Sequence, residues 1–318
     1  MLTSIIVLIT RIYKRELGPD VYDRHRGRVV REEEPLSAWL LNGVMYSWPL
    51  DVLDHTGLVR SWLKRHSWRA RQSHTTYASA LEIPEFVDFY GIQMSDFLQG
   101  NPSDFRNFNE FFIREVRPEC RPIARDGVIS AADSRLTVFN TLRDARRLFI
   151  KGRRFSFAGL LGKQHGHLLR RFGERCNIAN FRLHPMDYHR FHAPVTGRIT
   201  VLDHVPGQYY TVKTKALNSD VNVLCENTRT VVLIETSDQG EVLFVAIGAE
   251  DVGTVTMRVT EGELVRKGDE LGMFQFGGSD IVVVFDRDLV WDPDLLRWSK
   301  ISIETLVHAN ERIAKFAE

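Results

Sequence analysis

The chain has 318 residues, of which 43% are hydrophobic and 26% are charged, and its formal net charge is +1. These values are typical of a globular protein with a sizeable core, and they give no global electrostatic basis for binding nucleic acid. The three cysteines, Cys120, Cys176 and Cys225, lie far apart and show no spacing typical of a disulfide framework or a zinc site. Reduced, mostly buried thiols are the simplest interpretation, and they fit a reducing compartment.

Residues 1–80 are expected to form a helical region that contacts a membrane surface. The apolar run at residues 2–9 is far shorter than the roughly 20 residues that span a bilayer. It reads as an amphipathic helix, packed either on a membrane or on the protein's own core. Between Trp39 and Lys64, apolar residues and tryptophans lead into a basic cluster. This pattern favours a membrane-surface element over a helical bundle with a solvated basic face.

Residues 81–318 are expected to form the catalytic domain. Two short helices are predicted near its start, one at residues 83–90 with an early proline and one at 109–112. From Val128 onward, short β-branched runs alternate with turn residues, which predicts strands. The six clearest runs are residues 136–139, 197–202, 230–234, 242–247, 255–259 and 281–285. The predicted fold class is therefore α+β, with N-terminal helices on a predominantly β-sheet, sandwich-like or barrel-like body. A last helix is expected at residues 303–316.

Three clusters of residues could carry chemistry. Gly278 and Ser279 belong to a Gly-Gly-Ser sequence, which alone is usually a turn. His189 and His192 share a face if their segment is helical but not if it is a strand, and histidine readily moves protons near neutral pH. Asp133 would complete a Ser–His–Asp set, in which the histidine takes the serine proton and the aspartate orients the imidazolium. The remaining histidines do not lie in comparable clusters of reactive residues, and no metal site is expected.

These clusters resemble the motifs of the phosphatidylserine decarboxylase family. The strongest match is Asp-Tyr-His-Arg-Phe-His-Ala-Pro at residues 187–194. Residues 132–136 resemble the family's aspartate motif, and Phe-Gly-Gly-Ser at residues 276–279 resembles its cleavage motif. Further matching segments follow in family order at residues 108–118, 150–162, 218–221, 226–229, 245–249 and 267–272. Coincidence over so many ordered segments, from about residue 80 to 290, is negligible.

The resemblance implies a zymogen that cleaves its own chain between Gly278 and Ser279. The Ser279 hydroxyl would attack the preceding carbonyl, and elimination from the resulting ester would leave a covalent pyruvoyl group at residue 279. His192 would be the base that activates Ser279, and Asp133 would orient His192. The pyruvoyl cofactor would withdraw electrons from the substrate as CO₂ leaves, and His189 would be the proton donor that completes this carboxy-lyase reaction.

The family's substrate is phosphatidylserine and its product phosphatidylethanolamine, so the resemblance implies a role in phospholipid biosynthesis. It also implies a homodimer of processed units, with a peripheral membrane location facing a reducing compartment. A decarboxylase of a soluble aromatic amino acid, located in the cytoplasm, is an alternative with the same chemistry. A second alternative is an unprocessed, non-catalytic relative that binds a membrane or a protein. The apolar and basic N-terminal region favours a lipid substrate.

Asp280 departs from the family pattern, which usually has Ser or Thr after the cleavage serine. A carboxylate beside a developing oxyanion disfavours it. Slow or conditional processing is therefore a hypothesis, tested by comparing cleavage of the wild type with Asp280→Thr. The aspartate motif also reads Ala-Ala-Asp-Ser in place of Pro-Ala-Asp-Gly, but Asp133 itself is kept.

Overall fold

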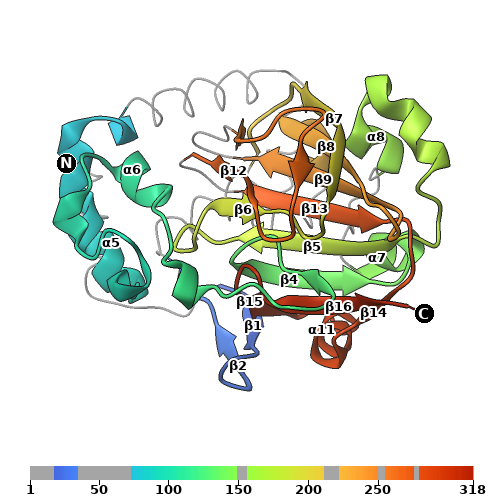
Figure 1. Ribbon diagram of the computed structural model, residues 1–318. Helices are drawn as coiled ribbons and strands as arrows, with labels where there is room; N and C mark the ends of the chain where they lie inside the picture. Colours follow the sequence, from blue (N-terminus) through green and yellow to red (C-terminus); the bar gives the residue numbers. More distant parts are fainter. Residues whose placement is uncertain are drawn as a thin grey trace, which may run out of the picture.

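The computed structural model describes residues 18–34, 73–148, 156–210, 222–249, 255–275 and 279–317. The largest feature of these residues is a ten-stranded sheet with helices against it, which confirms the predicted α+β class (Figure 1). The helix predicted near the N-terminus and the membrane element predicted at residues 39–64 lie outside the described residues. No helix among the described residues is both long and apolar enough to cross a bilayer.

Neighbouring strands of the large sheet are antiparallel except for one parallel pair, β1 with β15. In spatial order its strands are β11 (Leu264–Val265), β7 (Gly197–Val205), β8 (Arg229–Glu235), β9 (Glu241–Gly248), β13 (Ser279–Phe285), β5 (Asn177–Leu183), β4 (Ser134–Phe139), β15 (Glu304–Val307), β1 (Asp20–Asp23) and β2 (Arg28–Arg31). Two three-stranded sheets complete the β structure. They are β10 (Val255–Met257), β12 (Glu270–Phe274) and β6 (Arg190–His192), and β14 (Leu289–Trp291), β16 (Arg312–Phe316) and β3 (Val128–Ile129).

Strand β13 shows how the large sheet separates two apolar cores. Successive side chains of a strand point to opposite faces of its sheet. Ile281 and Val283 belong to the core shared with the two small sheets, whereas Val282 and Val284 belong to the core beneath the helices. Ser279 has the same parity as Ile281, so its side chain lies on the face that carries the small sheets.

The helices pack in three places. The core beneath the second face of the sheet is formed with α7 (Leu142–Leu148), α8 (Phe157–Leu161), α10 (Val223–Glu226) and the 3₁₀ segment Lys163–Arg170. A separate aromatic cluster holds α5 (Ile83–Tyr90) and α6 (Phe108–Phe112), which lie to the left in Figure 1, and α11 (Pro293–Ser299) packs on β4 and β15. Shorter 3₁₀ turns are Tyr77–Glu82, Met94–Asp96, Pro102–Asp104 and Pro118–Cys120.

The structure confirms the predicted helices at 83–90 and 109–112 and places a strand on each of the six β-branched runs. The predicted last helix at residues 303–316 is wrong. This segment forms β15 and β16, joined by a turn in which Asn310 has φ 70°. Each strand finds partners on both sides, β15 between β4 and β1 and β16 between β14 and β3, so sheet hydrogen bonds outweigh helix propensity.

The described parts of the N-terminal region contain both strand and helix, since the 3₁₀ segment Tyr77–Glu82 begins there. Residues 20–31 form the β1–β2 hairpin, which extends the large sheet at its β15 edge. Val21 is buried, and the Asp23 carboxylate accepts hydrogen bonds from the backbone N–H groups of His25 and Arg26 in the hairpin turn. This segment therefore packs as part of the sheet that contains Ser279.

Candidate active site

Ser279 is the first residue of β13, where it pairs with Leu183 of β5 and Gly248 of β9. Its side chain is fully buried, and within the described part of the chain its Oγ has no hydrogen-bond partner. Gly278, the other side of the predicted cleavage bond, lies outside the described residues. A buried hydroxyl without a partner costs free energy, so it is a signal of function rather than of stability.

His192 lies on β6 with both ring nitrogens engaged. Its Nδ1 is 2.9 Å from the carbonyl oxygen of Gly268, and its Nε2 is 3.1 Å from the hydroxyl of Tyr188. Because a carbonyl can only accept, Nδ1 carries the proton and Nε2 accepts the hydrogen bond from the tyrosine. Burial lowers the pKa of His192 below its ordinary value, so the ring is neutral at pH 7 and Nε2 can accept a proton.

His189 lies directly before β6 and is fully buried against the ring of Phe112, with 3.8 Å between ring centroids. Its Nδ1 donates to the carbonyl oxygen of Asp187 over 3.0 Å, and its Nε2 has no hydrogen-bond partner among the described residues. Burial lowers the pKa of His189 to about 3. The ring is therefore neutral, with an unshared electron pair at Nε2.

Asp133 lies in the turn before β4, and its buried carboxylate is held by a buried arginine. Nε of Arg121 donates to Oδ1 over 2.9 Å, Nη2 donates to Oδ2 over 2.7 Å, and the backbone N–H of Ala309 donates to Oδ1 over 2.7 Å. Burial alone would raise the pKa of Asp133, but Arg121 lowers it below the ordinary value. The carboxylate is therefore ionised.

The predicted hydrogen bond between Asp133 and His192 is absent from this structure, in which both residues are described. Gly268 takes the position at Nδ1 of His192 that the hypothesis assigns to Asp133. The two segments are nevertheless neighbours, because the N–H of His192 donates to the carbonyl of Ala131 over 2.8 Å. The charge of Asp133 also partly offsets the effect of burial on the pKa values of His189 and His192.

A buried ion-pair network beside these residues was not predicted from the sequence. Arg135 donates to Glu32 and Asp187, and Arg182 donates to Glu32 over 2.9 Å and to Glu304, with 2.9 Å between Nε and Oε1. The backbone of Asp187 in turn holds His189, so the network connects the N-terminal hairpin region to the histidine segment. Charged residues inside otherwise apolar strands are the sequence signal that could have revealed it.

Asp280 points to the face of the sheet opposite Ser279, because the two residues are consecutive in β13. Its side chain is fully buried, and Asn180 donates to its Oδ2 over 3.3 Å. Burial raises the pKa of Asp280 well above its usual range. Burial therefore favours the uncharged carboxyl, which weakens the electrostatic reason for expecting slow processing.

The predicted site residues have distinct chemical capacities, and in this structure the Oγ of Ser279 forms no hydrogen bond with either histidine. Ser279 supplies a hydroxyl, His192 a neutral imidazole that can accept a proton, and the Asp133–Arg121 pair a fixed, buried charge. A covalent group formed from Ser279 itself fits the unpartnered Oγ at the start of β13. Among the described residues, three metal-ligating side chains converge in one place, and that place lies outside this site.

Comparison with known proteins agrees with the motifs. The family model "Phosphatidylserine decarboxylase" matches residues 108–315. The chain is 41% identical to "Phosphatidylserine decarboxylase proenzyme 2" of Oryza sativa subsp. japonica over 304 residues, which are 92% of this chain and 48% of that protein. It is 36% identical to "Phosphatidylserine decarboxylase proenzyme 2" of Saccharomyces cerevisiae over 90% of this chain and 25% of that protein.

A bacterial relative is of more similar length. The chain is 32% identical to "Phosphatidylserine decarboxylase proenzyme" of Chlamydia caviae over 77% of this chain and 78% of that protein. The plant and yeast relatives are much longer, and this chain spans less than half the length of each. The similarity to the bacterial relative covers most of both chains. The residues that the family model matches include Asp133, both histidines and Ser279.

Proposed function

Because the chain belongs to the phosphatidylserine decarboxylase family, we propose that it is a proenzyme that cleaves itself at Gly278–Ser279 and then converts phosphatidylserine to phosphatidylethanolamine. The observation that carries this proposal is Ser279. Its hydroxyl is fully buried at the start of a central strand and has no hydrogen-bond partner among the described residues. Because the target is the adjoining peptide bond of the same chain, the nucleophile must lie beside that bond and does not need to be accessible to solvent.

Cleavage needs a base, and His192 is suited to that role. Ser279 Oγ attacks the carbonyl of residue 278 while Nε2 of His192 takes its proton and passes it to the departing Ser279 nitrogen, so the peptide C–N bond breaks as the ester C–O bond forms. Loss of the Cα proton then eliminates the carboxylate of residue 278 and leaves dehydroalanine at residue 279. Water replaces its nitrogen, which leaves as ammonia, and the pyruvoyl group results. Because Tyr188 donates to the same Nε2, its hydroxyl must move aside or relay the proton. The negative charge of Asp133 favours the imidazolium as it forms, although Gly268 and not Asp133 holds Nδ1.

A pyruvoyl group at residue 279 would withdraw electrons from a bound amine substrate as CO₂ leaves. The chain's own contribution at this step is a proton, and His189 is the candidate donor. Its neutral ring has no proton at Nε2 when Nδ1 donates to Asp187, so His189 must first take up a proton there. Its burial against Phe112 fixes the ring plane and excludes water from this side of the site.

The remaining parts of the proposal concern partners and location. A phospholipid substrate is supported by the names of the relatives, and a peripheral membrane location is supported by the apolar and basic sequence between Trp39 and Arg71. A homodimer of processed units is supported by the family resemblance alone, and a location facing a reducing compartment is supported by the three unpaired cysteines.

The first experiment is the mass of the freshly purified protein under denaturing conditions. We expect two fragments, residues 1–278 and 279–318, with the smaller one blocked at its N-terminus, and a single intact chain for the control Ser279→Ala. Vesicles containing phosphatidylserine are then converted to phosphatidylethanolamine with release of CO₂ by the wild type but not by the control. A wild-type chain that stays intact would contradict self-cleavage, and a cleaved chain inactive on the vesicles would contradict the lipid substrate.

A further inference from the structure

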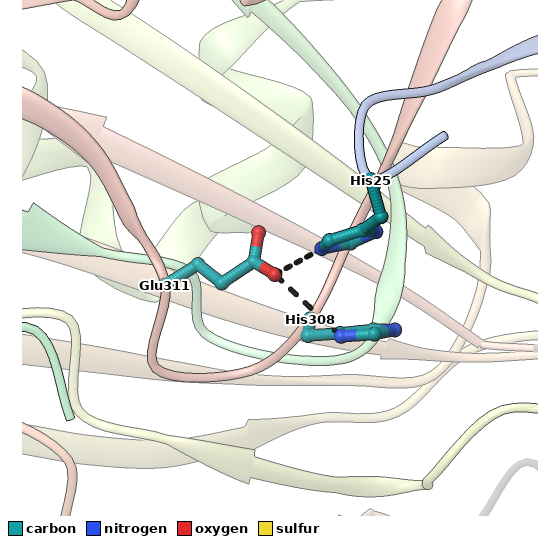
Figure 2. Close-up of side chains that lie close together, drawn as sticks. All are labelled: His25, His308 and Glu311. Atoms are coloured by element: carbon teal, nitrogen blue, oxygen red, sulfur yellow. Dashed lines mark hydrogen bonds and ion pairs between the residues drawn. The ribbon is translucent and has the colours of Figure 1, made fainter. Parts of the chain in front are cut away.

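Two histidines and a glutamate from distant parts of the chain converge on one edge of the protein. His25 comes from the turn between β1 and β2, whereas His308 and Glu311 come from the loop between β15 and β16 (Figure 2). One ligand atom from each of the three side chains lies within 4.8 Å of the others. None of these residues belongs to the site described above, and the family motifs do not include them.

The two imidazoles direct nitrogens at the same carboxylate oxygen. Nε2 of His25 hydrogen-bonds to Oε1 of Glu311, and Nδ1 of His308 lies 3.5 Å from the same atom. The rings are stacked with 4.1 Å between centroids and 18° between planes, so both present an edge to Glu311, as Figure 2 shows. Rotation of at least one ring out of the stack would turn both nitrogen lone pairs toward one ion beside Glu311.

The distances suit a small divalent ion of the zinc type. Such ions bind imidazole nitrogen and carboxylate oxygen at about 2.0–2.2 Å with tetrahedral geometry, which places ligand atoms about 3.3 Å apart. The pair formed by His308 and Glu311 already has nearly this separation. Side-chain rotation has to bring the widest pair closer by at most about 1.5 Å.

The surrounding charges are arranged so that Glu311 remains available. Within the described ranges, the arginine that pairs with Glu311 is Arg24, at 3.8 Å, but it lies closer to Asp292, at 3.2 Å, and Asp294, at 3.0 Å. Its charge is thus shared with two other carboxylates. Behind the ring of His25, Oδ1 of Asp23 lies 3.7 Å from Nδ1, where a carboxylate can orient a metal-binding histidine.

We propose that His25, His308 and Glu311 form a binding site for one divalent transition-metal ion, with Zn²⁺ as the ion that the donor set fits best. Three protein ligands leave a fourth position for water. The ion would join the β1–β2 turn to the β15–β16 loop. The same loop contains Ala309, whose N–H donates to Asp133, so a bound ion would stabilise the backbone that holds the buried aspartate.

The test uses the full chain, without a histidine tag, and Co²⁺ as a spectroscopic probe. We expect one Co²⁺ per chain with visible absorption typical of a low-coordinate nitrogen- and oxygen-bound ion, displaced by Zn²⁺. His25→Gln, His308→Gln and Glu311→Gln should each weaken binding by at least about tenfold. The matched control is His167→Gln, because this exposed histidine lies on the 3₁₀ segment Lys163–Arg170 and should bind Co²⁺ like the wild type.

A second readout distinguishes lost ligands from a damaged fold. Zn²⁺ should raise the Tm of the wild type and of His167→Gln but not that of the three ligand variants. Without metal, the Tm values of the ligand variants should stay near that of the wild type, because the side chains of His25 and His308 are 35% and 37% exposed. Absence of Co²⁺ binding by the wild type overturns the proposal. Binding that the three ligand substitutions leave unchanged overturns it as well, since the ion would then sit elsewhere.

Discussion

Replacing Asp280 by asparagine should leave the rate of self-cleavage unchanged. The amide has nearly the same volume and can keep the contact with Asn180. Burial favours the uncharged form of Asp280, and its side chain lies on the face of the sheet opposite Ser279. The substitution therefore removes no negative charge from the neighbourhood of the carbonyl under attack.

An ionised carboxylate would give a different result, and its size can be estimated. Two unit charges about 8 Å apart interact by about 2 kcal/mol at an effective dielectric constant of about 20. A change of about 1.4 kcal/mol in an activation free energy alters a rate tenfold. If Asp280 were charged, Asp280→Asn would therefore cleave about 30-fold faster than the wild type.

The assay follows the loss of full-length chain with time after cell-free synthesis, for the wild type, Asp280→Asn and Asp280→Thr. We expect the wild type and Asp280→Asn to agree within about threefold, which is less than 1 kcal/mol in the barrier. Asp280→Thr tests the residue usual in the family and removes the carboxyl altogether. An acceleration of about 30-fold in Asp280→Asn would refute the conclusion that the carboxyl is neutral.

The same substitution should change how stability depends on pH. The pKa of Asp280 is raised in the folded chain, whereas it returns to about 3.9 in the unfolded chain. Between these values the folded state holds a proton that the unfolded state has lost, so stability falls by about 1.4 kcal/mol per pH unit as pH rises. In the uncleavable Ser279→Ala chain, Asp280→Asn should gain stability over its parent from about pH 4 upward. A stability difference that does not vary with pH in urea denaturation would contradict this.

Three further predictions concern the residues around the histidines. Tyr188→Phe removes a hydrogen bond worth about 1 kcal/mol from Nε2 of His192, so self-cleavage should become about fivefold faster, and a slower rate on denaturing gels would show that the tyrosine relays the proton. Arg121→Met leaves the buried carboxylate of Asp133 without its ion-pair partner. It should lower the free energy of unfolding, measured in urea, by about 3–5 kcal/mol. A loss below about 1 kcal/mol would show that this pair is not buried in solution. Burial lowers the pKa of His189 to about 3, so between about pH 3 and 6.5 only the unfolded state binds a proton at this ring. The free energy of unfolding should therefore rise with pH over this range. Histidine NMR should show no titration of His189 between about pH 5 and 8.

The sequence predicts the fold where a strand is uniformly apolar and fails where polar residues interrupt it. The valine-rich run of β13 has the β-branched pattern typical of a buried strand. Strand β5 has the sequence Asn-Ile-Ala-Asn-Phe-Arg-Leu and is equally buried, but Asn180 and Arg182 interrupt its apolar pattern, so the pattern does not predict a strand there. These two side chains are tolerated because polar partners meet them: Asp280 from β13 contacts Asn180, and Glu304 from β15 and Glu32, directly after β2, contact Arg182.

In the candidate site, too, the sequence predicts local motifs but not the contacts between distant segments. The motifs give the types of reacting residue, and the structure brings the segments of Asp133 and His192 together through the backbone contact to Ala131. The partners of the reacting side chains come from elsewhere in the chain. Arg121 holds the aspartate and Gly268 holds the histidine, and such pairings depend on sheet register, which one sequence does not reveal.

The position of β13 has a consequence for what a cut at residue 278 would produce. The strand lies in the middle of the large sheet and pairs along seven residues with β9 on one side and with β5 on the other. Strands β15 and β16 of the same short fragment are also paired with strands from the long one, whereas β14 pairs with β16 inside the short fragment. The two products would therefore form an obligate complex whose shared interface is the core of a single domain. Dilution would not separate them, and neither fragment alone could rebuild the sheet.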